Sequence, residues 1–354
     1  MNRVEKLQQA MVGQGFGAML ITNPNNRLYA TGFSSSAGAL LITANDAWFI
    51  TDARYIEAAK TAITDAHVLL CTSDNPVHAL IKTLLNEHSI TAAGFEESSA
   101  TYSDHKEWSE KLGIELIPAQ KIINDLRAIK TPDDLEKMKN AQRIAEKSFE
   151  EILPLIRTDI TEKQLAAELL YRFLLNGADD KSFDTIVVSG SRSSMPHGVP
   201  EDIIIGLGFL TIDFGVRLDG WCSDTTRTVC IGKPDNEMIR IYDTVLDAQK
   251  AGIETVRAGV TGIDVDAAAR TVIEEAGYGE FFSHGFGHGL GLEVHEPLSA
   301  SIKSKNTLPA GAVISAEPGI YIPGKYGVRI EDVVYVTEDG CENITKLAKE
   351  LIIL

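Results

Sequence analysis

Five side chains that commonly bind metal ions stand in order along the second half of the chain. They are four carboxylates and one imidazole: Asp213, Asp224, His288, Glu317 and Glu331. Four carboxylates crowded into one site cannot all ionise unless cations hold them, because like charges at short distance repel. Two divalent ions would cancel this charge. A pair of ions roughly 3.5–4 Å apart activates a water and polarises a carbonyl together, so the set indicates hydrolysis.

The segment that holds the two aspartates reads as a strand, a turn and a second strand. Asp213 ends an almost wholly apolar run, where an unpaired carboxylate would carry a heavy desolvation penalty. A turn at Leu218-Asp219-Gly220 reverses the chain and brings in Asp224, eleven positions after Asp213. Two structural aspartates at a turn or a sheet edge would give the same pattern. This pair therefore indicates a metal site only together with the other three candidate ligands.

Three histidines, His284, His288 and His295, lie among glycines in SHGFGHGLGLEVHE, and His197 follows a proline in SSMPHGVP. A lone histidine is usually structural. Here four of the eight histidines fall in glycine- or proline-marked loops of one region, where the backbone can pass close to a ligand and the rings can converge. This grouping favours a functional site.

The last two carboxylates lie in strand-like segments. Glu317 opens EPGIYIPG, and Glu331 lies in GVRIEDVVYVT. Strand alternation places Arg329 and Glu331 on one face, with Ile330 on the other. Arg329 is therefore a candidate to orient the carboxylates through hydrogen bonds. The alternative is an ordinary surface strand with an ion pair.

The elements that must position these residues fall into two groups. From residue 2 to about 118, helical stretches alternate with short β-rich runs at 18–21, 39–42, 47–50, 67–71, 92–95 and 114–117, which predicts an α/β domain. Asn23-Pro24-Asn25-Asn26 reads as a turn. The loop GFSSSAG at residues 32–38 reads as small and flexible, able to reach a neighbour's site.

The character of the chain changes at Thr131, which suits a helix N-cap before Pro132. Helices are predicted at 133–153, 161–175, 236–256 and 264–276, and strands at 185–189, 208–214 and 221–231, with further strands carrying the last three ligands. We therefore expect an N-terminal domain over 1–125, a linker over 126–132 and a catalytic domain over 133–354.

Composition excludes several classes of protein. The 354 residues carry a formal charge of −17, which argues against binding nucleic acid or an anionic membrane surface. The first residues lack the apolar core of a secretory signal, and the apolar stretch from Ile203 to Ile212 is too short to span a bilayer, so a cytoplasmic protein is expected. The four cysteines form no C-x-x-C pair, which predicts free buried thiols.

Several motifs together resemble one family. DFG with SDTTRT, HGFGHGLGLEVHE, EPGIYIPG, GVRIED and SGSRSSMPHG are similar to the pita-bread-fold metallopeptidases, in the prolidase and aminopeptidase P branch. The resemblance covers nearly the whole chain. It implies an α/β N-terminal domain of the creatinase/prolidase type and an α+β catalytic domain with the pita-bread fold. It also implies that Asp213 binds one metal, that His288 and Glu317 bind the other, and that Asp224 and Glu331 bridge them.

The expected reaction is cleavage of an Xaa-Pro bond, a substrate that only the resemblance supplies. We expect two divalent ions, most simply Mn²⁺ with Co²⁺ or Zn²⁺ as substitutes, because an oxygen-rich site without thiolate suits harder ions. A hydroxide bridging the metals attacks the carbonyl, which one metal and His295 or His284 polarise. Glu317 passes a proton to the leaving nitrogen, and by resemblance His197 lies near the leaving side.

Other interpretations stay open at this point. The chain is either a prolidase acting on Xaa-Pro dipeptides or an aminopeptidase P acting on longer peptides, and the absence of a cation in GFSSSAG leans toward the latter. A non-catalytic binding module on the same fold, a two-metal phosphoesterase and an aminopeptidase of broader specificity, such as for methionine, are the alternatives. The resemblance also implies a homodimer.

Overall fold

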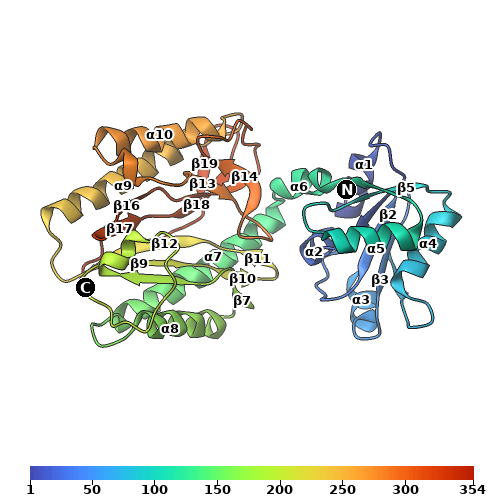
Figure 1. Cartoon of the computed structure of the whole chain (residues 1–354), viewed down its shortest axis with the longest axis horizontal. Helices are drawn as coiled ribbons and strands as arrows, with labels where there is room; N and C mark the ends of the chain where they lie inside the picture. The colour runs from blue at the N-terminus through green and yellow to red at the C-terminus, as the bar shows by residue number, and fades with distance from the viewer. The chain divides into compact units, whose positions relative to one another are not determined.

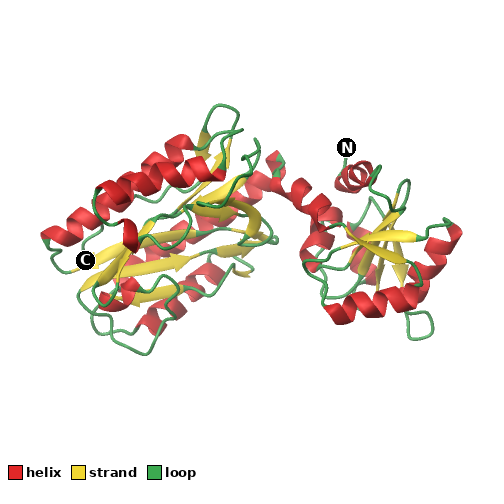
Figure 2. Ribbon diagram, turned by 45° about the horizontal axis from the view of Figure 1, so that its top comes forward, coloured by secondary structure: helices red, strands yellow, loops and turns green.

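The computed structural model describes residues 1–354 and divides into two compact units, Met1–Arg127 and Ala128–Leu354. We call them the N-terminal unit and the C-terminal unit. Figure 1 labels their elements, and Figure 2 shows that both mix helices with sheets. No helix in the protein is long and apolar enough to cross a membrane.

The N-terminal unit is built on one six-stranded sheet in the order β4-β3-β2-β1-β5-β6. Its strands are β1 (Ala18–Ile21), β2 (Ala39–Thr43), β3 (Ala47–Thr51), β4 (His67–Leu70), β5 (Ala92–Phe95) and β6 (Glu115–Pro118). The pairs β1–β2 and β2–β3 are antiparallel, and the other neighbours are parallel. The helices that begin in this unit are α1 (Arg3–Met11), α2 (Pro24–Thr31), α3 (Ile56–Ala62), α4 (Val77–Glu87), α5 (Tyr102–Leu112) and α6 (Gln120–Ala128).

The six strands predicted in this unit are confirmed, each to within one residue at either end. Every residue of β1, β2 and β3 is buried, and a fully buried strand reads as a continuous apolar run in the sequence. The predicted turn at Asn23 is wrong. Asn23 caps α2, accepting hydrogen bonds from the amides of Asn25 and Asn26, and Pro24 occupies the first helical position. The loop at residues 32–38 is also less free than expected, since the guanidinium of Arg27 donates to the carbonyls of Ser35 and Gly38.

Four helices of the C-terminal unit are α7 (Pro132–Ile152), α8 (Glu162–Leu175), α9 (Asn236–Thr255) and α10 (Gly262–Glu275). The sequence predicted each of them. Thr131 and Thr161 form capping boxes at the starts of α7 and α8, and Asp235 and Thr261 cap α9 and α10. Short polar side chains thus satisfy the amides that a helix start leaves free.

The strands of this unit form several small sheets. They are β7 (Asp180–Lys181), β8 (Ile186–Ser189), β9 (Gly208–Phe214), β10 (Val216–Leu218), β11 (Trp221–Cys222), β12 (Thr225–Ile231), β13 (Gly287–Gly289), β14 (Glu296–Ala300), β15 (Val313–Ala316), β16 (Gly319–Ile322), β17 (Tyr326–Arg329), β18 (Asp332–Val336) and β19 (Cys341–Asn343). Two orders matter for the site: β12-β9-β8, and β14-β13-β15-β18-β19.

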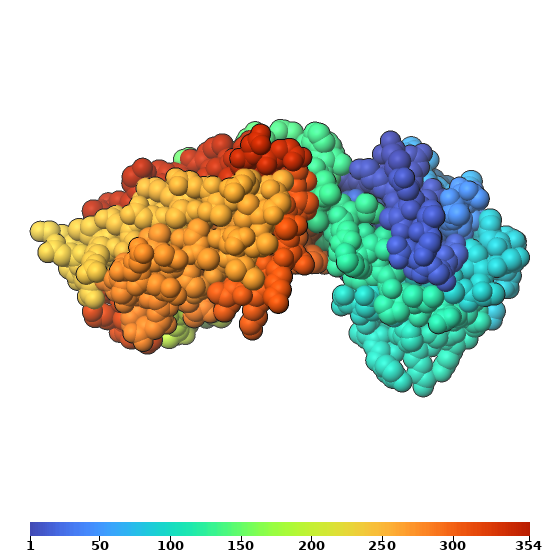
Figure 3. All heavy atoms as spheres, turned by 90° about the horizontal axis from the view of Figure 1, so that it is seen from above, coloured from blue at the N-terminus to red at the C-terminus, as the bar shows by residue number.

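Helix pairs cover these strands on two sides (Figure 1). The pair α7 and α8 shares one apolar core with Leu210, Ile212 and Phe214 of β9. The pair α9 and α10 shares another core with strands that include β15 and β18. Figure 3 shows α9 and α10, coloured yellow to orange, covering the face of this unit that is turned to the viewer. Strands β9, β12 and β15, which contribute to these cores or lie beside them, are accordingly buried almost throughout.

The cysteines are only partly as expected. All four are free; Cys222 and Cys230 are buried, whereas Cys71 and Cys341 are partly exposed.

Candidate metal centre

Strand alternation aims the first aspartate away from the α7 and α8 core. Ile212 and Phe214 of β9 pack in that core, so Asp213 between them points to the opposite face. Strand β12 runs antiparallel to β9 and pairs Thr226 with Asp213. Asp224 precedes β12 directly and is likewise buried. The predicted turn is confirmed, with Asp219 at a φ of 51°. The strand predicted over 221–231 is divided into β11 and β12, and Asp224 lies in the break between them.

The backbone around His288 requires glycine. A Cβ on Gly287 would lie 2.0 Å from the carbonyl oxygen of Ser315, so only glycine allows β13 to approach β15 this closely. The pairing of β13 with β14 shifts register after His288, a β-bulge of the kind that redirects side chains beside active sites. The hydroxyl of Ser315 accepts a hydrogen bond from the His288 amide and donates to Glu317 Oε1, both at 3.0 Å.

The two glutamates lie just beyond strand ends. Glu317 follows β15, and its amide donates to the carbonyl of Phe286 at 2.8 Å. Glu331 lies between β17 and β18, where its amide donates to the carbonyl of Thr226 and its Oε2 accepts from the Thr226 hydroxyl at 2.8 Å. Thr226 thus holds Glu331 by both backbone and side chain.

The five candidate ligands converge on one place. Ligand atoms of Asp224, His288 and Glu331 all lie within 4.8 Å of one another. His288 Nε2 lies 3.6 Å from Asp224 Oδ2 and 3.2 Å from Glu317 Oε1. His288 Nδ1 lies 3.1 Å from the carbonyl of Gly289, to which it donates, so Nε2 is the nitrogen left to bind a metal.

Two buried oxygens in this cluster, Asp213 Oδ1 and Glu331 Oε1, have no hydrogen-bond partner. Burial raises the pKa of both Asp224 and Glu331 well above its usual range, and the neighbouring carboxylates raise each pKa further. A site that binds cations brings together unpaired oxygen acceptors and carboxylates that repel one another. These residues therefore fit divalent ions.

His288 and Glu317 form a close ionisable pair. Burial opposes the charge on both groups, but the hydrogen bond and charge of each favour the charged form of the other. The pKa of Glu317 is therefore lowered to about 2, and the pKa of His288 is raised. A proton on His288 thus supplies the positive charge that a metal ion would bring.

Arg329 connects the aspartate to a second histidine. Its guanidinium donates to Asp213 Oδ2 at 2.7 Å and to the hydroxyl of Tyr321 at 2.9 Å. That hydroxyl lies 2.9 Å from His284 Nε2, while His284 Nδ1 lies 2.8 Å from the carbonyl of Gly285. Both ring nitrogens of His284 are therefore engaged. Burial lowers the pKa of His284, which keeps the ring neutral.

His284, His295 and His197 all line a cavity of about 820 Å³ in the C-terminal unit. The ring of His295 lies 4.1 Å from the ring of His288, and burial followed by the charge of His288 lowers its pKa. His197 lies on the loop after the short helix Gly190–Ser194 and is exposed. The cavity lining also includes all five candidate ligands and Arg329.

Sequence reasoning missed two residues of this network, Thr226 and Tyr321. Thr226 lies in SDTTRT, and its hydroxyl donates to Glu331 and accepts from Arg329 Nε at 3.0 Å. Tyr321 lies in EPGIYIPG, four positions after Glu317, and burial raises its pKa to about 12. Both stand in motifs that hold a ligand, which is the signal that could have pointed to them.

Comparisons with known proteins cover most of the chain. Residues 136–338 match metallopeptidase family M24, and residues 3–129 match the creatinase/prolidase N-terminal domain. The chain is 42% identical to the uncharacterized peptidase YqhT of Bacillus subtilis, and the match covers 99% of this chain and 100% of that protein.

Two solved structures are similar over almost their whole length. The Xaa-Pro dipeptidase from Bacillus anthracis has a TM-score of 0.96 at 41% identity, with 99% of both chains covered. The X-Pro aminopeptidase from Thermotoga maritima has a TM-score of 0.92 at 37% identity, with 98% of this chain and 99% of that chain covered. These findings confirm the resemblance and the predicted fold class.

Proposed function

We propose that this chain, which belongs to metallopeptidase family M24, uses two divalent metal ions to hydrolyse the bond between an N-terminal residue and a following proline. The observation that carries the proposal is the pair of buried, unpartnered oxygens on Asp213 and Glu331, within a cluster of four carboxylates. Relatives named as an Xaa-Pro dipeptidase and an X-Pro aminopeptidase support the choice of substrate.

Five residues would hold the ions: Asp213, Asp224, His288, Glu317 and Glu331. When bound, two divalent ions supply a water of lowered pKa and polarise the scissile carbonyl. Manganese suits the oxygen-rich ligand set.

The histidines take different roles in this proposal. His295 has no hydrogen bond that occupies its ring and lines the cavity, so we assign it the donation to the developing oxyanion. His284 has both ring nitrogens engaged and instead orients Tyr321 and Arg329. Glu317 lines the cavity beside His288, so we assign it the transfer of a proton from water to the leaving nitrogen.

The rest of the cavity suits a small apolar side chain and a proline ring. Its lining includes Ala166 and Leu170 of α8, Phe183, Ile186 and Val294. Because an Xaa-Pro bond carries no N–H, recognition of the substrate depends on such shape contacts more than on the scissile amide.

The test compares three peptides after loading with Mn²⁺. We expect cleavage of an Xaa-Pro dipeptide or of a longer Xaa-Pro peptide, and none of the same peptide with alanine in place of proline. The two proline substrates separate a dipeptidase from an aminopeptidase. Equal cleavage of the alanine peptide would indicate a broader aminopeptidase instead.

Further measurements address the other interpretations. Hydrolysis of p-nitrophenyl phosphate without peptide cleavage would identify a phosphoesterase. No turnover of any substrate by protein that holds two metals would favour a binding module. Fully active protein with one metal or none would refute the dinuclear model.

A further inference from the structure

We propose that Gln249 and Lys349 are positioning residues that set the spacing between Glu317 and Glu331. This inference rests on the proposed function, because it concerns the two glutamates assigned there as metal ligands. Neither Gln249 nor Lys349 lines the cavity, so both would act through other residues.

Gln249 of α9 is fully buried and ties two ligand segments together. Its Nε2 donates to the carbonyl of Ala316 at 3.2 Å and to the carbonyl of Ile330 at 3.3 Å. Ala316 directly precedes Glu317, and Ile330 directly precedes Glu331. One side-chain amide therefore bridges the backbone just before each glutamate.

An amide can hold this bridge only in one orientation. If the Gln249 amide turned over, its oxygen would face two carbonyl oxygens and leave both unpaired. Lys349 prevents this, because its Nζ donates to Gln249 Oε1 at 3.0 Å, and an ammonium group can pair only with the oxygen end. The cation thus fixes which end of the amide meets Ala316 and Ile330.

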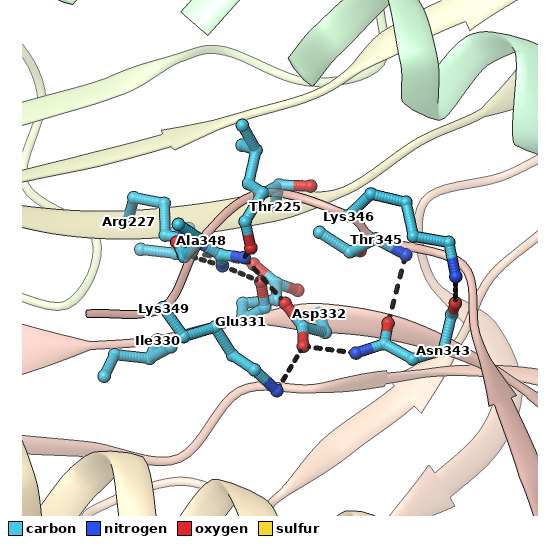
Figure 4. Close-up of polar contacts among 12 residues, drawn as sticks. Thr225, Arg227, Ile330, Glu331, Asp332, Asn343, Thr345, Lys346, Ala348 and Lys349 are labelled. Atoms are coloured by element: carbon cyan, nitrogen blue, oxygen red, sulfur yellow. Dashed lines mark hydrogen bonds and ion pairs between the residues drawn. The ribbon is translucent and has the colours of Figure 1, made fainter. Parts of the chain in front are cut away.

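Lys349 is itself held by a buried carboxylate next to the metal centre. Figure 4 shows Asp332 between Lys349 and Asn343, with its Oδ2 accepting from Lys349 at 2.8 Å and from Asn343 at 2.6 Å. Asp332 Oδ1 accepts from Arg227 at 2.8 Å, and Arg227 also donates to the carbonyl of Glu331. Asp332 directly follows Glu331 and is fully buried.

These contacts make a continuous relay from the segment around residue 349 to both glutamates. Arg227 extends it by donating to the carbonyls of Leu347 and Ala348, each at 2.9 Å. Side chains that orient metal ligands without touching the metal typically change metal affinity by about 10–100-fold when removed. We therefore expect the relay to act on metal affinity.

The experiment titrates metal-free protein with Mn²⁺ alone and follows binding by calorimetry, without substrate. Lys349→Met should bind Mn²⁺ about 10–100-fold more weakly than the unmodified protein. Lys346→Met is the matched control. It is the same substitution three positions away, at an exposed lysine whose side chain donates a hydrogen bond to the carbonyl of Asn343. Its affinity should be unchanged, and Lys349→Arg, which keeps the cation, should restore most of the affinity lost in Lys349→Met.

A double-mutant cycle separates positioning from a merely structural role. If Gln249 and Lys349 act through one relay, Gln249→Met combined with Lys349→Met should weaken Mn²⁺ binding no more than the worse single change. Independent structural damage would add instead and would overturn the inference. If Lys349→Met does not fold, Gln249→Glu is the deciding variant. It keeps the contact with Lys349 but offers no donor to the carbonyls of Ala316 and Ile330. Unchanged Mn²⁺ affinity in Gln249→Glu would overturn the relay.

Failure of the proposed function would look different. Unmodified protein that binds no Mn²⁺ would refute the proposed metal centre. Unmodified protein that binds two Mn²⁺ ions, with Lys349→Met equal to Lys346→Met, would refute the relay alone.

Discussion

Replacing Arg329 by methionine tests how the candidate site stabilises its own buried charge. The side chain of Arg329 is 4% exposed and that of Asp213 is 13% exposed, and they pair at 2.7 Å. Methionine keeps much of the volume but leaves Asp213 with neither oxygen paired, because Oδ1 already lacks a partner. Breaking a buried ion pair by removing one member typically costs about 3–5 kcal/mol.

The assay is urea unfolding, for the free energy, and thermal unfolding, for Tm, of the metal-free protein and of the protein loaded with Mn²⁺. In metal-free protein the loss of about 3–5 kcal/mol should appear in full, lowering Tm by roughly 6–20 °C for a unit of this size. In loaded protein the loss should be smaller, because a cation again neutralises Asp213. Lys325→Met is the control, four positions before Arg329 in the chain. It breaks an exposed ion pair with Glu237, and exposed ion pairs contribute little to the free energy of unfolding.

Two results would refute this reasoning. Arg329→Met would lose no more stability than Lys325→Met only if water solvated Asp213, so equal losses would contradict the burial argument. A loss of the same size with and without Mn²⁺ would contradict the assignment of Asp213 as a ligand.

Five further predictions concern metal binding, stability and assembly. Asp224→Asn should lower metal stoichiometry and turnover together, since one bridging charge is lost; two bound metals with normal kcat would contradict this. His288→Ala should lose a metal, whereas His295→Ala should keep both and lose kcat by about 10²–10³-fold, as metal analysis beside kinetics would show. Metal affinity should fall as the pH decreases, and the fall should begin above roughly pH 6.5. The pKa of His288 is raised above that ordinary value, and a histidine must be deprotonated to bind a metal. Metal-free protein should lose stability as pH rises through the raised pKa of Glu331. The folded state binds this proton more tightly than the unfolded chain does, so losing it removes a stabilising difference. Unfolding measured across a pH series checks the direction of the change. Sedimentation equilibrium should find a homodimer, and an active monomer would exclude it.

The sequence predicted most elements because their signals are local. The bounds of β1, β5 and β9 match the predicted runs, and the starts of α7 and α8 follow from Thr131 and Thr161. The turn predicted at Asn23 failed for a local reason as well: asparagine before proline suits both a turn and a helix start, and α2 is only eight residues long.

The parts of the site that escaped prediction depend on tertiary register. Thr226 meets both Arg329 and Glu331 only because β12 lies beside the end of β17 and the residues that follow it. The contact between Tyr321 and His284 joins positions 37 apart in the chain. Spacing in the sequence put His284, His288 and His295 within 11 positions of one another. Only the fold distinguishes His284, whose ring nitrogens are both engaged, from His295.

The contacts made by residues 347–349 reach the candidate ligands from a segment that carries none of them. The carbonyl of Leu347 accepts a hydrogen bond from Arg227, and Lys349 orients Gln249. None of these residues lines the cavity. Substitutions that change metal affinity can therefore arise in this segment, at positions that the cavity lining alone would not single out.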